Sequence, residues 1–308
     1  MNFIATKKTG HGADKPVSRL LRLAKNPKRL WPVLVRWYFL HVRSRAIRLF
    51  ESENIDSAQS FAFFVGYPRS GHSLIGAILD AHPDCVCSHE LNAIDYLRRG
   101  VSGRQVLSMV LARSEWFSKI DNIWTGYSYS IPGLSQGVYD KPVVLMDKMG
   151  GATTKLFRLN ESLVVRVGST LGKDVRALHV IRNPFDNIST RAMGGALNKN
   201  AVDTEQLQKS IDDHFDDIET NWKIIESDDL SVMTIRYERF LEDPVRELRR
   251  ICGFLSLYPD SNYLKDSTAG VYESSSKSRS RVHWPRELRS QVELRSRKYE
   301  FLNGYTFD

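Results

Sequence analysis

An aromatic strand that runs directly into a glycine-bounded turn is the feature that most constrains this chain. Residues 61–66 (Phe-Ala-Phe-Phe-Val-Gly) form an apolar run typical of a buried strand, and residues 74–81 carry apolar side chains at helical spacing. The turn between them, Gly66-Tyr-Pro-Arg-Ser-Gly-His72-Ser73, has the spacing G-x-x-x-x-G-H-S. Successive N–H groups in such a turn, together with the N-terminus of the next helix, form a cradle for an anion. The pattern therefore predicts a phosphate-binding loop, with His72 where nucleotide triphosphatases carry Lys.

Further buried strands alternate with helices along the chain. Strands are predicted at 143–146, 175–181 and 232–235, and helices at 90–99, 103–119, 153–171, 203–226 and 243–255. This alternation predicts a three-layer α/β fold with a central parallel sheet. A Ser-, Lys- and Arg-rich stretch at 266–283 breaks the periodicity and predicts a mobile loop. We expect a basic N-terminal arm or helix over 1–50 and a single domain over 51–308.

The positive charge of the chain is concentrated at its N-terminal end. The net charge is +8, yet residues 1–50 carry twelve Lys and Arg against one acid, Asp14, so the remainder is slightly acidic. This distribution argues against a nucleic-acid-binding body. Together with Trp31, Trp37 and Tyr38, the arm has the composition of a segment that lies on an anionic membrane surface. The alternative is a solvated tail followed by a helix that packs on the body.

The sequence lacks the patterns of a membrane-spanning segment, a secretory signal and a metal site. No run of about 18 uncharged apolar residues and no secretory cleavage pattern is visible, so we expect a cytoplasmic protein without a spanning helix. The three cysteines, Cys85, Cys87 and Cys252, are too few for a disulfide framework and predict buried thiols. No metal-ligand spacing is present, so we expect no metal cofactor.

A second motif follows the strand predicted at 175–181. Residues 182–190 read Arg-Asn-Pro-Phe-Asp-Asn-Ile-Ser-Thr. An Arg at the carboxyl end of a parallel strand and hydroxyls in the following helix can converge on a phosphate, because ligands bind at that edge of open α/β sheets. The planar guanidinium of Arg69 suits a tetrahedral oxyanion in the first loop. Two anion sites indicate a nucleotide with phosphates at both ends.

These two motifs resemble those of sulfotransferases that use 3′-phosphoadenosine 5′-phosphosulfate (PAPS). The resemblance covers residues 61–290, and over 69–83 it is most similar to tyrosylprotein sulfotransferases and their bacterial relatives. It implies that the loop binds the 5′-phosphosulfate and the second motif the 3′-phosphate. The residues so implied are Arg69, Ser70, Gly71, His72 and Ser73 in the loop, and Arg182 with Ser189 or Thr190 in the second motif. His72 departs from the family Thr, and Thr190 stands in strict register with the family Ser.

The same register implies roles for residues further along the chain. Glu90 corresponds to the proposed general base of the family, and Lys148 to a Lys that stabilises the transition state. Tyr237 matches a Tyr near the adenosine. The Ser- and Arg-rich loop, with Arg279 and Arg281, resembles a loop that closes on the 3′-phosphate.

Chemistry alone leaves alternatives for these side chains. A base must lie within about 3 Å of the acceptor proton, and either Glu90 or His89 could fill that role. Glu90 could instead complement a helix dipole, and Lys148 could be a surface residue at a strand end. The aromatic cluster of Trp116, Phe117, Trp124, Tyr127 and Tyr129 fits an acceptor pocket or a core equally well.

The predicted function is transfer of a sulfuryl group from PAPS to a hydroxyl, or alternatively an amine, with release of adenosine 3′,5′-bisphosphate. We expect a small-molecule, lipid or glycan acceptor, and peripheral membrane contact through residues 1–50 as an option. The alternatives are a small-molecule kinase and a non-catalytic protein that binds membranes or polyanions. His72 in the Lys position argues against the kinase.

Overall fold

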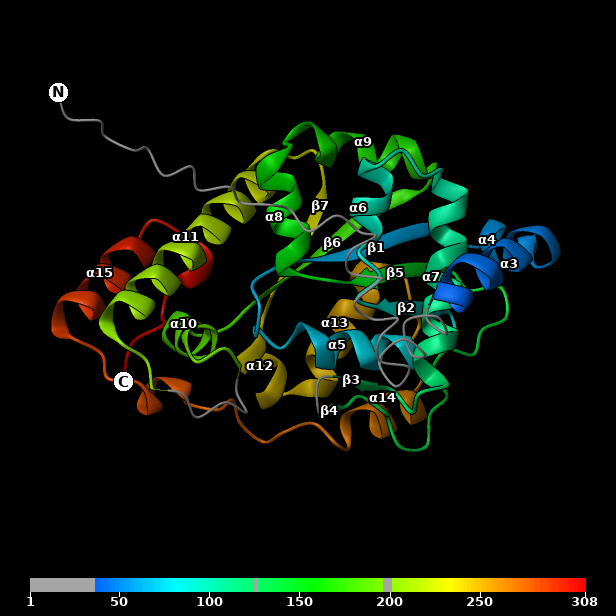
Figure 1. Ribbon diagram of the computed structural model, residues 1–308. Coiled ribbons are helices and arrows are strands. Elements are labelled where there is room, and N and C mark those ends of the chain that lie inside the picture. The colour runs from blue at the N-terminus through cyan, green and yellow to red at the C-terminus, as the bar shows by residue number, and fades with distance from the viewer. Residues whose placement is uncertain (1–36, 125–126, 196–200) are drawn as a thin grey trace, which may run out of the picture.

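A five-stranded parallel sheet forms the centre of the computed structural model, which describes residues 37–124, 127–195 and 201–308 (Figure 1). The strand order is β2-β5-β1-β6-β7. The strands are β1 (Ser60–Gly66), β2 (Cys85–His89), β5 (Val144–Lys148), β6 (Asp174–Ile181) and β7 (Ser231–Arg236). The sheet confirms the predicted α/β class. Strand β2 appears in the sequence only as a short apolar piece, yet it adds the edge that carries two candidate catalytic residues.

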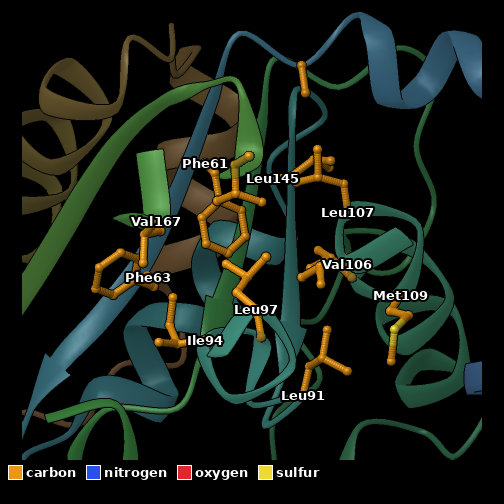
Figure 2. Close-up of a cluster of buried hydrophobic side chains, with 14 of the residues drawn as sticks. Phe61, Phe63, Leu91, Ile94, Leu97, Val106, Leu107, Met109, Leu145 and Val167 are labelled. Atoms are coloured by element: carbon orange, nitrogen blue, oxygen red, sulfur yellow. The ribbon is translucent and has the colours of Figure 1, made fainter. Parts of the chain in front are cut away.

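Helices cover both faces of the sheet, because the side chains of β1 alternate between two cores. Phe61, Phe63 and Val65 pack into one core, part of which Figure 2 shows, and Ala62 and Phe64 into the other. The first face carries α6 (Ala93–Arg98), α7 (Gly103–Ser118), α8 (Gly151–Leu159) and α9 (Ser162–Leu171). The second carries α5 (His72–Asp80), α12 (Tyr237–Glu242), α13 (Pro244–Leu255) and α14 (Ser261–Thr268).

A third hydrophobic cluster lies beyond β6. It joins α10 (Pro184–Ala192), α11 (Thr204–Glu226), α15 (Arg286–Ser296) and the short η3 (Glu300–Leu302). Trp284 is buried in this cluster against Phe185, with ring centroids 5.2 Å apart. The cluster therefore anchors the C-terminal part of the chain beside the second motif.

Three local predictions differ from the structure. The helix expected over 153–171 is two helices, because Asn160 adopts an extended backbone (φ −154°) between α8 and α9. The helix expected from residue 90 begins at Ala93, because Glu90 and Asn92 both have left-handed backbones. The loop expected over 266–283 is shorter, since α14 ends at Thr268 and residues 278–281 form the 3₁₀ turn η2 (Ser278–Arg281).

The basic arm over residues 1–36 lies outside the described residues. From Trp37 onward, the π-helical turn η1 (Phe39–Arg43) and α3 (Ser44–Phe50) pack on α7, followed by α4 (Ser52–Asp56). Leu40 and Ile47 join the same core as β1, and the predicted boundary after residue 50 stays a prediction. In the described part of the chain, no helix is long and apolar enough to cross a membrane. All three cysteines are buried free thiols, as predicted.

Candidate active site

The loop between β1 and α5 has the strained backbone of an anion cradle. Arg69 (φ 73°) and Gly71 (φ 96°) both lie in the left-handed region, which turns the chain sharply before α5 begins at His72. A Cβ atom on Gly71 would lie 2.3 Å from the ring of Tyr237, the first residue of α12. Glycine is therefore required here on two grounds, backbone conformation and close approach. The contact also places Tyr237 directly against the loop.

His72 occupies the loop without adding a charge. Its Nδ1 lies 3.1 Å from Ser70 Oγ, and its side chain is buried. Burial, reinforced by the charges of Lys148 and Arg69, lowers the pKa of His72 to about 3. The imidazole is therefore neutral near pH 7, and the positive charge of the region comes from Arg69 and Lys148.

Lys148 is the centre of the candidate catalytic group. It ends strand β5 and is 1% exposed, and its Nζ donates to Ser73 Oγ at 3.0 Å and to Glu90 Oε1 at 3.0 Å. His89 Nε2 lies 3.3 Å from the same nitrogen. Burial lowers the pKa of Lys148, and the Glu90 carboxylate partly offsets that shift. Lys148 is thus a buried cation between the loop and the end of β2, which excludes the alternative of a surface lysine.

Glu90 is held as a carboxylate by two donors. Trp124 Nε1 donates to its Oε2 at 2.8 Å, and Lys148 binds the other oxygen. Burial acts to raise the pKa of Glu90, but the charge of Lys148 and the two hydrogen bonds outweigh it and hold the pKa below its ordinary value. Since Glu90 precedes α6 with a left-handed backbone, its side chain points to the sheet edge.

His89 is a neutral, stacked side chain. Its ring lies 4.2 Å from that of Phe117 in a nearly parallel stack. Burial, and then the charges of Lys148 and Arg113, lower the pKa of His89 to about 2. Its Nε2 faces the Lys148 ammonium. The His89 imidazole is therefore neutral near pH 7.

Asp147 fixes the turn that presents Glu90, and sequence reasoning missed it. Its buried carboxylate accepts from Ser88 Oγ at 2.8 Å, Leu91 N at 3.0 Å and Ala93 N at 2.8 Å. These bonds tie both sides of Glu90 to strand β5. The only signal in the sequence is an acid that precedes Lys148 at the end of an apolar run.

The second motif meets the loop at the same edge of the sheet. Arg182 follows β6 and donates through Nη1 to the backbone oxygen of Arg69 at 3.4 Å, and its Nη2 donates to both oxygens of Ser276. Ser189 and Thr190 are both buried. Ser189 Oγ accepts from Trp284 Nε1 at 3.0 Å, whereas Thr190 Oγ1 lies 2.9 Å from Ser278 Oγ.

The Ser- and Arg-rich loop within residues 266–283 contacts the second motif through Arg279. Its Nη1 pairs with Asp186 Oδ2 at 2.6 Å, and its backbone N–H donates to Asp186 Oδ1 at 2.9 Å. Arg281 is exposed at the end of η2. The structure therefore brings Arg279 to the second motif and leaves Arg281 on the surface.

The predicted aromatic cluster is buried in one part and partly exposed in the other. Trp116 and Phe117 are buried, whereas Trp124, Tyr127 and Tyr129 are partly exposed around a short hairpin, β3 (Ile123–Trp124) and β4 (Tyr127–Ser128). The Tyr129 ring centroid lies 5.0 Å from that of His89. The core alternative therefore holds for Trp116 and Phe117, and an acceptor pocket at the other three rings stays a prediction.

Comparison with known proteins decides the family. A sequence model described as "Sulfotransferase domain" matches residues 60–298. The chain belongs to the sulfotransferase family. This confirms the expected resemblance and sulfuryl-transfer activity, and neither the kinase nor the non-catalytic alternative is favoured.

Several solved sulfotransferase structures match the chain at low sequence identity. STF9 from Mycobacterium avium is 10% identical, with 93% of this chain and 91% of that chain covered and a TM-score of 0.50. The sulfotransferase domain of the Synechococcus PCC 7002 olefin synthase is 15% identical, with 75% and 82% covered and a TM-score of 0.43. Mouse SULT7A1 complexed with PAP is 13% identical, with 79% and 86% covered and a TM-score of 0.41. No curated protein matches the chain significantly.

The site of this sulfotransferase fits the PAPS that the family uses. The left-handed backbone at Arg69 and Gly71 forms a cradle that a Cβ on Gly71 would disrupt. The buried Nε of Arg182 has no hydrogen-bond partner among the described residues, so the guanidinium keeps a donor for a ligand. The described residues also contain no group of three His, Cys, Asp or Glu that could hold a metal ion. Metal independence stays a prediction.

Proposed function

We propose that this sulfotransferase transfers a sulfuryl group from PAPS to a hydroxyl of a small-molecule, lipid or glycan acceptor, and releases adenosine 3′,5′-bisphosphate. One observation carries the proposal. Lys148 Nζ lies 3.0 Å from Ser73 in the loop and 3.0 Å from Glu90 beside the aromatic cluster. A cation therefore stands between a candidate donor site and a candidate base.

The donor would be held by the residues of the two motifs. The loop, with Arg69, Ser70, Gly71, His72 and Ser73, is assigned to the 5′-phosphosulfate, and its N–H groups suit that anion. Arg182, with Ser189 or Thr190 and the C-terminal Arg279 and Arg281, is assigned to the 3′-phosphate. Tyr237, packed on Gly71, is assigned to the adenosine side. When bound, PAPS supplies an activated sulfuryl group.

Glu90 and Lys148 would have different roles in the transfer, Glu90 as the base for the acceptor hydroxyl and Lys148 as the source of positive charge. The Glu90 carboxylate accepts the proton of the acceptor hydroxyl, and its lowered pKa keeps it ionised for that task. Lys148, whose Nζ donates to Ser73 Oγ, would supply positive charge to stabilise the negative charge of the leaving group. Trp124 would keep the carboxylate in place during proton uptake, because its Nε1 donates to Glu90 Oε2.

His89 is the alternative base, and the contacts favour Glu90. His89 Nε2 lies 3.3 Å from Lys148 Nζ, so a proton taken up by His89 would place two positive charges side by side, whereas protonation of Glu90 creates no such pair. A hydroxyl rather than an amine acceptor, metal independence and a cytoplasmic location remain parts of this proposal.

An acceptor screen tests the proposed reaction. The purified chain is incubated with sulfur-35-labelled PAPS and pools of phenols, lipids and oligosaccharides, with a chelator present. We expect label on one class of hydroxyl acceptor without added metal. In a parallel arm with γ-labelled ATP and Mg²⁺, transfer of phosphate with no transfer of sulfate would contradict the proposal.

A further inference from the structure

The helix that precedes the sheet presents apolar side chains on its outer side. Residues 39–50 run through η1 and α3, and their inner side packs on α7 through Leu40 and Ile47 (Figure 1). Exposed large apolar side chains lie on the outside at Trp37 (57%), Tyr38 (54%), Val42 (41%), Leu49 (67%) and Phe50 (84%). Exposed large apolar side chains that fall within one segment of fourteen residues mark an interaction surface more often than single exposed residues spread over the molecule do.

Positive charge accompanies these apolar residues. Arg45 is exposed on the outer side, and Arg48 is half-buried next to Leu49. Arg43 is used internally, in ion pairs with Glu115 at 2.9 Å and Glu51 at 2.6 Å. The preceding residues 1–36 add nine Lys and Arg against one acid. The surface therefore combines apolar side chains, interfacial aromatics and cationic groups.

We propose that residues 37–50 dock this protein on an anionic membrane surface. Trp37, Leu49 and Phe50 would enter the boundary between headgroups and acyl chains, while Arg45 and Arg48 would bind anionic headgroups. Nucleic acid would satisfy the charge alone and would leave the apolar side chains in water. A bilayer satisfies both. The docking does not depend on the assignment of any catalytic residue.

Vesicle sedimentation tests this surface with the full chain. The probes are vesicles of phosphatidylcholine alone and of phosphatidylcholine with one fifth phosphatidylglycerol. The test variant is Leu49→Ser with Phe50→Ser, which removes exposed apolar side chains. The matched control is Tyr258→Ser with Leu294→Ser, since those side chains are 91% and 68% exposed elsewhere on the molecule. Unchanged melting temperatures of both variants establish that folding is intact.

We expect wild type and the control to bind the anionic vesicles, and the Leu49/Phe50 variant to bind at least about tenfold more weakly. Raising the salt concentration from 0.1 to 0.5 M should also weaken binding, because it screens the headgroup contacts. Equal binding to both vesicle types, or unchanged binding of the Leu49/Phe50 variant, would overturn the proposal. Binding of an oligonucleotide without binding of vesicles would also overturn it. So would a dimer, detected by light scattering, that the Leu49/Phe50 variant disrupts while wild type binds no vesicles.

Discussion

The proposed donor and acceptor sides of the candidate active site are built in different ways. On the donor side, contiguous motifs place backbone N–H groups, short hydroxyl side chains and arginines, and glycine geometry fixes the loop. On the proposed acceptor side, the candidate groups are the consecutive His89 and Glu90 at the end of β2, together with Trp124 from the distant strand β3. Lys148 joins the two sides through Ser73 and Glu90. The donor side is thus specified locally and the acceptor side by tertiary contacts.

Removing the link between the two sides should have the largest effect. Lys148→Met keeps the volume of the buried side chain but removes the cation beside Ser73. We expect turnover to fall by about 10³-fold, the scale of losing one preorganised charge-stabilising group. The matched control is Lys155→Met, an exposed lysine on α8. Steady-state rates on the acceptor found by screening measure both, and near-normal turnover of Lys148→Met would remove it from the mechanism.

Glu90→Gln should damage the acceptor side alone. The amide keeps an acceptor for Trp124 but cannot take up the proton, so turnover should fall by about 10²-fold. Affinity for adenosine 3′,5′-bisphosphate, measured by calorimetry, should stay unchanged. His89→Gln is the comparison, with an expected loss of less than about tenfold. Normal turnover of Glu90→Gln together with an inactive His89→Gln would show that His89, and not Glu90, is the base.

Gly71→Ala should damage the donor side alone. Its Cβ would meet the Tyr237 ring at 2.3 Å, so the loop must shift, and affinity for adenosine 3′,5′-bisphosphate should fall at least about tenfold. Gly100→Ala is a close control, because Gly100 also has a positive φ, 85°, with no atom within 4 Å of the added carbon. The control should bind normally. Equal affinities for Gly71→Ala and wild type would disprove the cradle.

Trp124→Phe should give the smallest effect and sharpen the acceptor side. The ring remains, but the N–H that donates to Glu90 is lost. Because that bond lowers the pKa of Glu90, its loss should raise the pKa. The acidic limb of the pH–rate profile should therefore move to higher pH, with a loss of turnover of no more than about tenfold. Trp116→Phe is the control, since Trp116 Nε1 has no hydrogen-bond partner in the described chain. Identical pH–rate profiles for the two variants would contradict the proposal that Trp124 positions Glu90.

The predictability of the site follows the same division. The loop and the second motif could be predicted because each is contiguous and requires particular residues, such as Gly71 and Arg182. The environment of Glu90 could not, because it depends on Trp124 from β3 and on Asp147 and Lys148 from β5, which only tertiary contacts bring together. Strand β1 was predictable because it is a continuous apolar run, whereas β2, although equally buried, is short and ends in the polar residues Ser88 and His89. The break at Asn160 had no sequence signal that outweighed the helical pattern.

Ligand-induced thermal stabilisation tests the central claim most directly, because it reads the donor side without an acceptor. Adenosine 3′,5′-bisphosphate, ATP with Mg²⁺ and AMP are compared at equal concentration. At about 100 times its dissociation constant, the bisphosphate should add about 2.7 kcal/mol of stability and raise the melting temperature by a few degrees. AMP and ATP with Mg²⁺ should have little effect. A shift from ATP with Mg²⁺ and none from the bisphosphate would contradict the account.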